Sequence, residues 1–421
     1  MNNLIDINTR IQYANLIRNI FLKDNKHIFT HKNFNNITIL YTSKHYFNKY
    51  IINHLGTIGG SIDAEAYKLE PKNGYPLAIK FCPLTKIELT HMMNIEFKVW
   101  KELEILKILY GLLQQNISPN LPIIYFYCIC SNMAKNDYSN PNIKKFYNNK
   151  NIRISIKDNI IDDNEKKAYI LNRMNKKKDY GMNSLCIINE LCDTTIKDIL
   201  NDKHETHIDD FIFKSFIFQI ISGIYTYIKY GNIVHFDLHG GNILISKIKP
   251  DKYWVYNINN NIYYLYNYGY ILKIWDFGRS YIIGKDSNEI IITQLKSQMI
   301  RFMDKIFDED VKLKTDMYIT ITNNNIHFIC FCFDLWRITS YILSKLNKTE
   351  LLSYQYSNTI KLLDNIRKKC LYNWIYSLVN RQITNTLEHF VDSLLHKYFK
   401  DYTDNKNIDK SNIINKKHYT C

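Results

Sequence analysis

The 421-residue chain has little glycine and proline: 13 glycines and seven prolines, with none of the prolines after Pro250. Its nine cysteines do not form the paired, closely spaced motifs that bind structural zinc. Cys128 and Cys130, like Cys330 and Cys332, alternate within apolar runs, which favours buried free thiols in a reducing compartment. The first residues lack a basic region followed by an uninterrupted apolar stretch, so no secretory signal is predicted.

The sequence also has no run of residues that predicts a membrane span. Its most apolar long stretch, 211–228, is interrupted by Lys214, Gln219 and small polar residues. A span requires about 20 predominantly apolar residues, so we interpret this stretch as a buried helix and expect no membrane association. The formal net charge of +15 suits an anionic partner or a Lys-rich solvated surface, and charge alone favours the second.

Hydrophobic residues make up 46% of the chain, enough at this length for two or three compact units. Strand-like patterns dominate the first half, at 50–67 around a glycine cluster and at 77–81, 121–130 and 185–189. Helical patterns occur at 95–113, 195–201, 209–230 and over most of the chain after 325, and a hairpin pattern occurs at 250–275. The predicted fold class is α+β, arranged as two lobes.

Three segments fall outside these patterns. Residues 1–48 carry no recognisable chemistry, and we expect them to form an N-terminal extension. The composition of 131–180, rich in Asn, Lys and Asp, predicts a long insertion. The same composition over 401–421 predicts a disordered tail.

One polar segment follows the apolar pair at 233–234 and reads His235-Phe-Asp237-Leu-His239-Gly-Gly-Asn242. Phosphoryl transfer requires metal-held phosphates, a cation on their oxygens and an oriented acceptor hydroxyl. A loop here can aim Asp237 at that hydroxyl and turn Asn242 to an oxygen-ligated Mg²⁺. The alternative is an ordinary polar turn between a helix and a strand.

A second carboxylate follows the strand-like run 271–275, in Asp276-Phe277-Gly278. Mg²⁺ prefers such an oxygen ligand, and glycine permits the sharp turn that follows. Alone, this tripeptide favours a simple turn. Its place downstream of Asp237 and Asn242 argues against a chance occurrence of all three.

Together these residues resemble the catalytic loop and the metal-binding loop of the protein kinase superfamily. The resemblance covers about 50–345 and implies a bilobal fold, with a small β-rich N-lobe at 49–189 and a mostly helical C-lobe at 190–400. It implies ATP and Mg²⁺ as cofactors. In style the sequence is similar to kinase-like proteins of giant and other large DNA viruses, which implies the host cytoplasm or the virion as its location.

The resemblance assigns the main roles. Asp237 would be the catalytic base, and Asn242 and Asp276 would be metal ligands. Lys80, in an Ala-Ile-Lys strand, would hold the α and β phosphates of ATP and pair with Glu102 of the next helix. Taken alone, that lysine and that glutamate are each more typical of a solvated surface.

The resemblance also implies an ATP pocket made of Gly59, Ser61, Ala66, Ala78, Lys80, Glu190, Cys192 and Leu244. His235, Phe277 and Leu106 would form the apolar spine that ties the lobes together. Asp334, before Leu335-Trp336, would brace the catalytic loop. Seen alone, that aspartate could equally cap a helix.

Several features depart from the family pattern. The phosphate-covering loop retains only the first of its three glycines, Gly59. Phe236 stands where regulated kinases carry Arg, so we predict that activity does not require phosphorylation of the activation segment. His239 replaces the Lys of Ser/Thr kinases, as in small-molecule phosphotransferases, and the lack of proline after Pro250 excludes the Ala-Pro-Glu element.

The leading hypothesis is a Ser/Thr protein kinase whose partners are ATP and a protein substrate. The alternatives are a small-molecule kinase of the aminoglycoside or choline type and a catalytically silent scaffold on the same fold. Retention of Lys80, Glu102, Asp237, Asn242 and Asp276 argues against the scaffold. Nucleic-acid binding is not favoured as the main role, because no aromatic-basic recognition module accompanies the basic charge.

Overall fold

The computed structural model describes residues 6–23, 39–40, 51–54, 65–69, 76–130, 180–201, 208–250, 252–303, 325–348, 350–379, 386–403, 413–414 and 419–420. They form a mixed α+β protein, which confirms the predicted fold class at that level. The chain divides into two compact units. The helical unit comprises Met1–Ile11, Ile105–Pro122 and Cys192–Cys421, and the sheet unit comprises Gln12–Glu104 and Ile123–Leu191.

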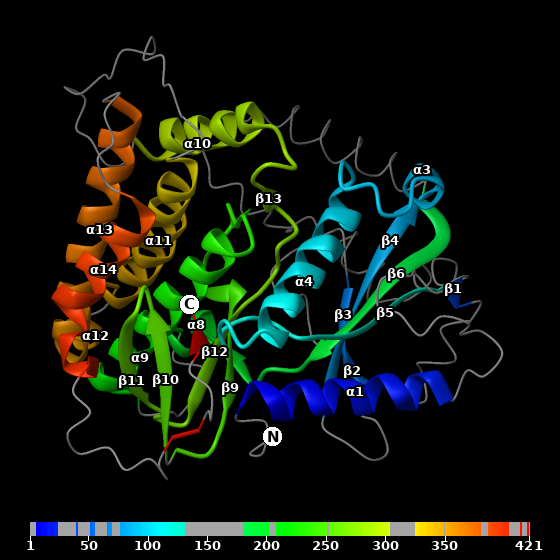
Figure 1. The fold of residues 1–421 in the computed structure, drawn as a ribbon, viewed down its shortest axis with the longest axis horizontal. Coiled ribbons are helices and arrows are strands. Elements are labelled where there is room, and N and C mark those ends of the chain that lie inside the picture. Colours follow the sequence, from blue (N-terminus) through cyan, green and yellow to red (C-terminus); the bar gives the residue numbers. More distant parts are fainter. Residues whose placement is uncertain are drawn as a thin grey trace. The chain divides into compact units, whose positions relative to one another are not determined.

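The sheet unit contains a six-stranded sheet with the strand order β1-β5-β6-β4-β3-β2 (Figure 1). Its strands are β1 (Ile39–Leu40), β2 (Ile51–His54), β3 (Glu65–Leu69), β4 (Leu77–Thr85), β5 (Ile124–Cys130) and β6 (Tyr180–Glu190). Along β4, Leu77, Ile79 and Phe81 are buried, whereas Ala78 and Lys80 are partly exposed. This period of two places Ala78 and Lys80 on one face of the sheet.

The sheet is accompanied by the helices α1 (Ile7–Lys23), α3 (Lys86–Thr90) and α4 (Lys98–Gln114). α1 and α4 each belong partly to the helical unit. In α1, Arg18 donates to two main-chain carbonyls at the start of β5, at 2.6 and 3.0 Å. Of the predicted extension 1–48, the structure describes α1 and β1, and both contact β5, β1 by parallel pairing.

The helices of the helical unit are α8 (Ile196–Ile199), α9 (Asp210–Lys229), α10 (Asn288–Met303), α11 (Ile326–Leu346), α12 (Glu350–Gln355), α13 (Ser357–Val379) and α14 (Leu387–Tyr398), with the 3₁₀ turns η1 (Gly240–Asn242) and η2 (Lys400–Thr403). α9 packs against α11 and α13 (Figure 1). It begins where the carboxylate of Asp209 accepts the N–H of Ile212 at 2.8 Å. Nearly every residue from Phe213 to Ile228 is buried.

Within the described residues, α9 and α11 are the two helices long and apolar enough to cross a membrane. In the most apolar part of α9, 83% of the residues are buried inside the protein, and in that of α11, 78% are buried. The core helix of a soluble protein passes the same test, so these helices are weak evidence for a membrane protein. Their burial supports the interpretation of 211–228 as a core helix.

The helical unit also contains small sheets with the strand orders β12-β9-β7, β11-β10-β14 and β13-β8. Their strands are β7 (Thr194–Thr195), β8 (Ile233–Val234), β9 (Ile243–Lys247), β10 (Tyr253–Ile258), β11 (Asn261–Tyr266), β12 (Tyr270–Ile274), β13 (Tyr281–Ile282) and β14 (Tyr419–Thr420). The predicted hairpin is formed by β10 and β11. Asn259 and Asn260, at φ +49° and +67°, supply the left-handed pair that a two-residue hairpin turn requires.

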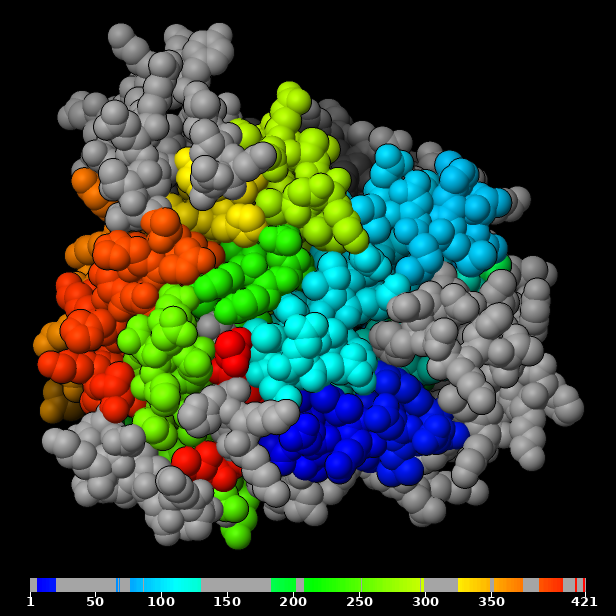
Figure 2. All heavy atoms as spheres, in the orientation of Figure 1, coloured from blue at the N-terminus to red at the C-terminus, as the bar shows by residue number. Residues whose placement is uncertain are grey.

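The prediction of a disordered tail over 401–421 is wrong at its end. Tyr419–Thr420 form β14, which pairs in parallel with β10. The Tyr419 ring is 1% exposed and meets the ring of Tyr256 with centroids 5.5 Å apart. Figure 2 shows the red C-terminal residues against the green atoms of the hairpin. A polar composition predicted disorder, but one buried aromatic ring and a strand pairing order this end.

A buried polar group fixes β12, the strand that leads to the second predicted carboxylate. Asn120 donates to Gln219 Oε1 at 3.0 Å and to the carbonyl of Leu272 at 2.9 Å. The N–H of Leu272 donates to the same glutamine oxygen at 2.9 Å. α9 also approaches β12 closely, because a Cβ at Gly223 would lie 2.8 Å from Ile274 Cδ1. These contacts leave the end of β12 little freedom to shift.

Candidate active site

The segment 235–242 leaves β8 as a sharp loop and ends in η1. Phe236 has φ +58°, a left-handed conformation that is strained for a bulky side chain. The main-chain N–H groups of His235 and Phe236 donate to the carboxylate of Asp334 on α11, at 2.8 and 3.1 Å. These two bonds hold the loop in its strained form.

Asp334 is fully buried and lies inside α11 rather than at its start. It also accepts the hydroxyl of Tyr227 from α9 at 2.9 Å. Burial raises the pKa of the Asp334 carboxyl, and the hydrogen bonds that it accepts act in the opposite direction. The prediction that Asp334 braces the loop backbone is confirmed, and the alternative of a helix cap is wrong.

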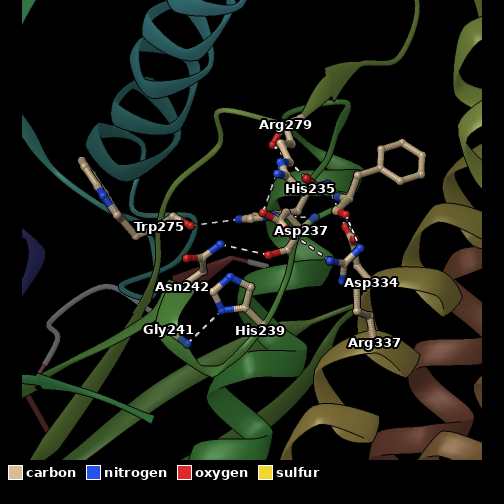
Figure 3. Close-up of polar contacts among 11 residues, drawn as sticks. His235, Asp237, His239, Gly241, Asn242, Trp275, Arg279, Asp334 and Arg337 are labelled. Carbon is tan, nitrogen blue, oxygen red and sulfur yellow. Dashed lines mark hydrogen bonds and ion pairs between the residues drawn. The ribbon is translucent and has the colours of Figure 1, made fainter. Parts of the chain in front are cut away.

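Asp237 is 17% exposed and lies between two arginines (Figure 3). Arg337 of α11 donates through Nη2 to Asp237 Oδ1 at 2.6 Å and through Nη1 to the carbonyl of Phe236 at 2.5 Å. Arg279 is 69% exposed, and its Nε lies 3.6 Å from Asp237 Oδ2. Neither arginine was predicted from the sequence, although Arg337 lies three residues after Asp334 and so on the same helix face.

The pairing of β9 with β12 brings the two predicted metal ligands to one end of a strand pair. The register pairs Ile274 with Ile243, and the N–H of Trp275 donates to the carbonyl of Asn242 at 2.9 Å. Asp276 follows at φ +62°, a left-handed conformation that aspartate adopts more readily than most residues. Asn242 and Asp276 therefore each lie just beyond the paired strands.

The side-chain amide of Asn242 is held in place. Its Nδ2 donates to the carbonyl of Asp237 at 2.9 Å (Figure 3), which orients Oδ1, the atom that a hard cation would take. No group of three His, Cys, Asp or Glu side chains that could hold a metal occurs among the described residues. Mg²⁺ commonly uses one or two protein ligands together with phosphates and waters, and Asn242 and Asp276 fit that donor set.

His235 and Phe277, two of the predicted spine residues, are in contact, with ring centroids 4.8 Å apart. The Nδ1 of His235 accepts the N–H of Asp237 at 3.2 Å, so the neutral ring carries its proton on Nε2. Nε2 then donates to the carbonyl of Trp275 at 2.9 Å. Both nitrogens of this buried ring are used, so its role is structural. Leu106, the third predicted member, is buried in α4.

His239 lies in the same loop, below Asp237 and Asn242 in Figure 3. Its Nδ1 accepts the N–H of Gly241 at 3.1 Å. Burial lowers the pKa of His239 below the usual 6.5, while the carboxylates of Asp237 and Asp276 act to raise it. The ring is therefore neutral near pH 7 and carries its proton on Nε2, which makes it a hydrogen-bond donor without charge.

In the sheet unit, Lys80 of β4 and Glu102 of α4 form the predicted pair. Lys80 Nζ lies 2.6 Å from Glu102 Oε1, and the two side chains are 13% and 6% exposed. The period of β4 explains this position, since alternate residues point to one face of the sheet. Both residues belong to the sheet unit, so the pair forms within one compact body. The alternative of two solvated surface residues is wrong.

The predicted ATP-binding residues of the sheet unit are only partly described. Gly59 and Ser61 lie outside the described residues. Ala66 and Ala78 are partly exposed on the neighbouring strands β3 and β4. Ala66 pairs directly with Lys80, so the small side chain lies beside the lysine.

The other predicted residues of the ATP pocket, Glu190, Cys192 and Leu244, have different surroundings. Glu190 is buried, and its carboxylate accepts the N–H of Ile123 at 3.1 Å, which gives it a structural role. In the helical unit, Cys192 and Leu244 are both partly exposed. Leu244 pairs with Lys273, whose Nζ lies 3.9 Å from Cys192 Sγ. Lys273 of β12 therefore lies beside both residues.

Each unit thus contains one group of the predicted residues. No protein-family model matches the chain, and no curated protein is significantly similar to it. A functional assignment therefore rests on the chemistry of the loop at 235–242, of Asp276 and of the Lys80–Glu102 pair.

Proposed function

We propose that the protein is an ATP-dependent phosphotransferase with a bilobal, protein-kinase-like fold, and that it transfers the γ-phosphate of ATP to a serine or threonine hydroxyl of a protein. The observation that carries the proposal is the fixed arrangement of Asp237, Asn242 and Asp276 in the helical unit. Phosphoryl transfer requires positioning and charge more than covalent chemistry. A held carboxylate in one loop with the oriented amide of Asn242, and with Asp276 just after the paired strand β12, suits that requirement.

Asp237 is assigned to the acceptor. The acceptor oxygen bonds to the γ-phosphorus, the bond from that phosphorus to the β–γ bridging oxygen breaks, the hydroxyl proton passes to the Asp237 carboxylate, and ADP leaves. Oδ1 accepts from Arg337 at 2.6 Å, whereas Arg279 is 3.6 Å from Oδ2. Oδ2 is therefore the oxygen that we assign as the proton acceptor.

Asn242 and Asp276 are assigned to Mg²⁺, which when bound would neutralise charge on the phosphates. The bond from Asn242 Nδ2 to the carbonyl of Asp237 keeps the amide oxygen oriented. His239 adds a neutral N–H donor to the same loop. The loop therefore offers a proton acceptor, one oxygen ligand and a donor for an anionic oxygen, and Asp276 would supply the second ligand.

The Lys80–Glu102 pair supports the proposal from the sheet unit. Burying two charges carries a desolvation penalty of several kcal/mol per ion, which the pair's mutual attraction offsets only in part. A lysine oriented by a carboxylate at 2.6 Å suits the phosphates of ATP, which argues against the scaffold alternative.

A second candidate acceptor is a small molecule. It is favoured by His239, which stands where Ser/Thr kinases carry a lysine. ATP consumption measured against peptides and against amino-alcohol or sugar acceptors separates the two classes. A cytoplasmic location, with neither a membrane nor nucleic acid as the main partner, is part of the same proposal.

The proposal is tested by transfer of label from γ-labelled ATP in the presence of Mg²⁺, using the full chain. Asp237→Asn should lower the rate about 10²- to 10⁴-fold with ATP binding unchanged, because only the proton acceptor is removed. Asp276→Asn should instead weaken the Mg²⁺-dependent binding of nucleotide.

Asp364→Asn is the matched control, because Asp364 pairs with Arg367 and Lys368 of its own helix, α13, at 2.7 Å each. It should leave both transfer and binding unchanged. No transfer by the wild type to any acceptor class would refute the proposal. Equal effects of the Asp237 and Asp276 variants on nucleotide binding would refute the assignment of their roles.

A further inference from the structure

Two residues of α11 bind the loop that carries Asp237, one through its N–H groups and one through its oxygens. Asp334 accepts the N–H groups of His235 and Phe236. Arg337, three residues later on the same helix face, donates to the carbonyl of Phe236 and to the carboxylate of Asp237. One helix therefore holds the backbone before the carboxylate, through Asp334, and the carboxylate itself, through Arg337.

The guanidinium of Arg337 suits this role because it is planar and rigid, with its donors in a fixed fork. Its two nitrogens lie 2.5 Å from a main-chain oxygen and 2.6 Å from a side-chain oxygen of adjacent residues. Because one rigid group makes both bonds, the direction of the Asp237 side chain is tied to the peptide that precedes it. That peptide belongs to Phe236, whose φ of +58° would relax without partners.

The position of Arg337 separates it from an ordinary surface ion pair. Its side chain is 19% exposed, and it contacts a carboxylate that is 17% exposed. Arg279, which reaches the other oxygen at 3.6 Å, is 69% exposed. Exposed pairs contribute little, whereas short charge-assisted bonds in partly buried sites restrict geometry.

We propose that Arg337 is a positioning residue that directs Asp237 toward the acceptor hydroxyl, an inference that rests on the proposed phosphotransfer. Asp334 and Arg337 act as a clamp on the loop, with Asp334 on the N–H groups and Arg337 on the carbonyl and the carboxylate. The clamp belongs to the helical unit alone and needs no nucleotide to form.

The experiment compares Arg337→Met and Arg337→Lys with Arg367→Met in the full chain. Arg367 is the matched control because it pairs with Asp364 within α13 and is 38% exposed. Two readouts are measured: kcat and KM for ATP in the labelled transfer assay, and hydrogen–deuterium exchange of peptides covering 233–244. The exchange readout does not depend on activity.

Arg337→Met should lower kcat about 100-fold with KM for ATP unchanged, because misplacement of a catalytic group by about 1 Å has that effect. Exchange in 233–244 should become about tenfold faster, since a charge-assisted bond is lost. Arg337→Lys should fall between Arg337→Met and the wild type, because it keeps the charge but not the fork. Arg367→Met should match the wild type in both readouts.

The inference is overturned if Arg337→Met matches Arg367→Met in kcat and exchange. It is also overturned if Arg337→Met raises KM for ATP together with the loss of kcat, which would place Arg337 on the nucleotide. If the wild type transfers no label, the proposed function fails. Faster exchange in Arg337→Met but not in the control Arg367→Met would then still establish the clamp, and unchanged exchange in Arg337→Met would remove it.

Discussion

The contact of Asp334 with the loop predicts a large and specific loss of stability on substitution. Asp334→Ala leaves three donors without their acceptor: the Tyr227 hydroxyl and the N–H groups of His235 and Phe236. Each unsatisfied buried donor costs about 1–3 kcal/mol. Relaxation, and relief from burying a carboxylate, offset part of the sum. We therefore expect a loss of about 3–5 kcal/mol in the free energy of unfolding, as for other broken buried charge networks.

Asp334→Asn keeps the side-chain volume and one acceptor oxygen, so we expect a smaller loss of about 1–3 kcal/mol. Urea unfolding followed by tryptophan fluorescence measures both, because Trp275 and Trp336 lie in the helical unit. Asp364→Ala, which removes a partly exposed carboxylate at 31% exposure, should cost no more than about 1 kcal/mol. If Asp334→Ala were no more harmful than this control, the bracing role would be refuted.

Two further predictions concern the loop itself. Gly240→Ala should slow transfer at least about tenfold, because the added Cβ would overlap the Tyr341 ring and shift the turn before Asn242. The double variant Gly240→Ala/Tyr341→Ala removes that ring and should recover part of the rate. A double variant as slow as Gly240→Ala would contradict this cause. Burial lowers the pKa of His239 in the folded state below 6.5, its value in the unfolded chain. The contribution of the neutral ring to the free energy of unfolding is therefore present in full above pH 6.5 and is lost as the pH falls through the folded-state pKa. Melting temperatures between pH 5 and 7.5 should therefore fall less in acid for His239→Asn than for the wild type, and parallel profiles would contradict this assignment.

Local patterns predicted much of the architecture. The strands at 77–81, 121–130 and 185–189 and the helices at 95–113 and 209–230 all occur, with ends shifted by a few residues. Periods of two and of 3.6 residues are properties of neighbouring side chains, so they can be read without knowing the partner of each element. The strand at the C-terminus was missed because its order comes from pairing with β10, which is remote in the sequence.

The candidate site divides in the same way. Asp237, Asn242 and Asp276 were named because their spacing and order match the needs of phosphoryl transfer. Arg337 was missed because its contact joins residues 100 apart, and a lone arginine in an apolar helix carries no local signal of its target. Because Phe236 stands where regulated kinases carry Arg, the sequence predicted a loop with no arginine next to Asp237. In the structure, the guanidinium of Arg337 on α11 binds the same loop.

The sequence alone supplied the candidate groups for the proposed chemistry and predicted the elements that bear them, because side-chain chemistry and periodicity are local properties. Only the tertiary structure decided which groups meet: the clamp of Asp334 and Arg337 on the loop, the short Lys80–Glu102 pair and the buried ring of Tyr419. Such contacts depend on the packing of elements far apart in the chain, where burial sets the strength of each bond and no local pattern records the partner.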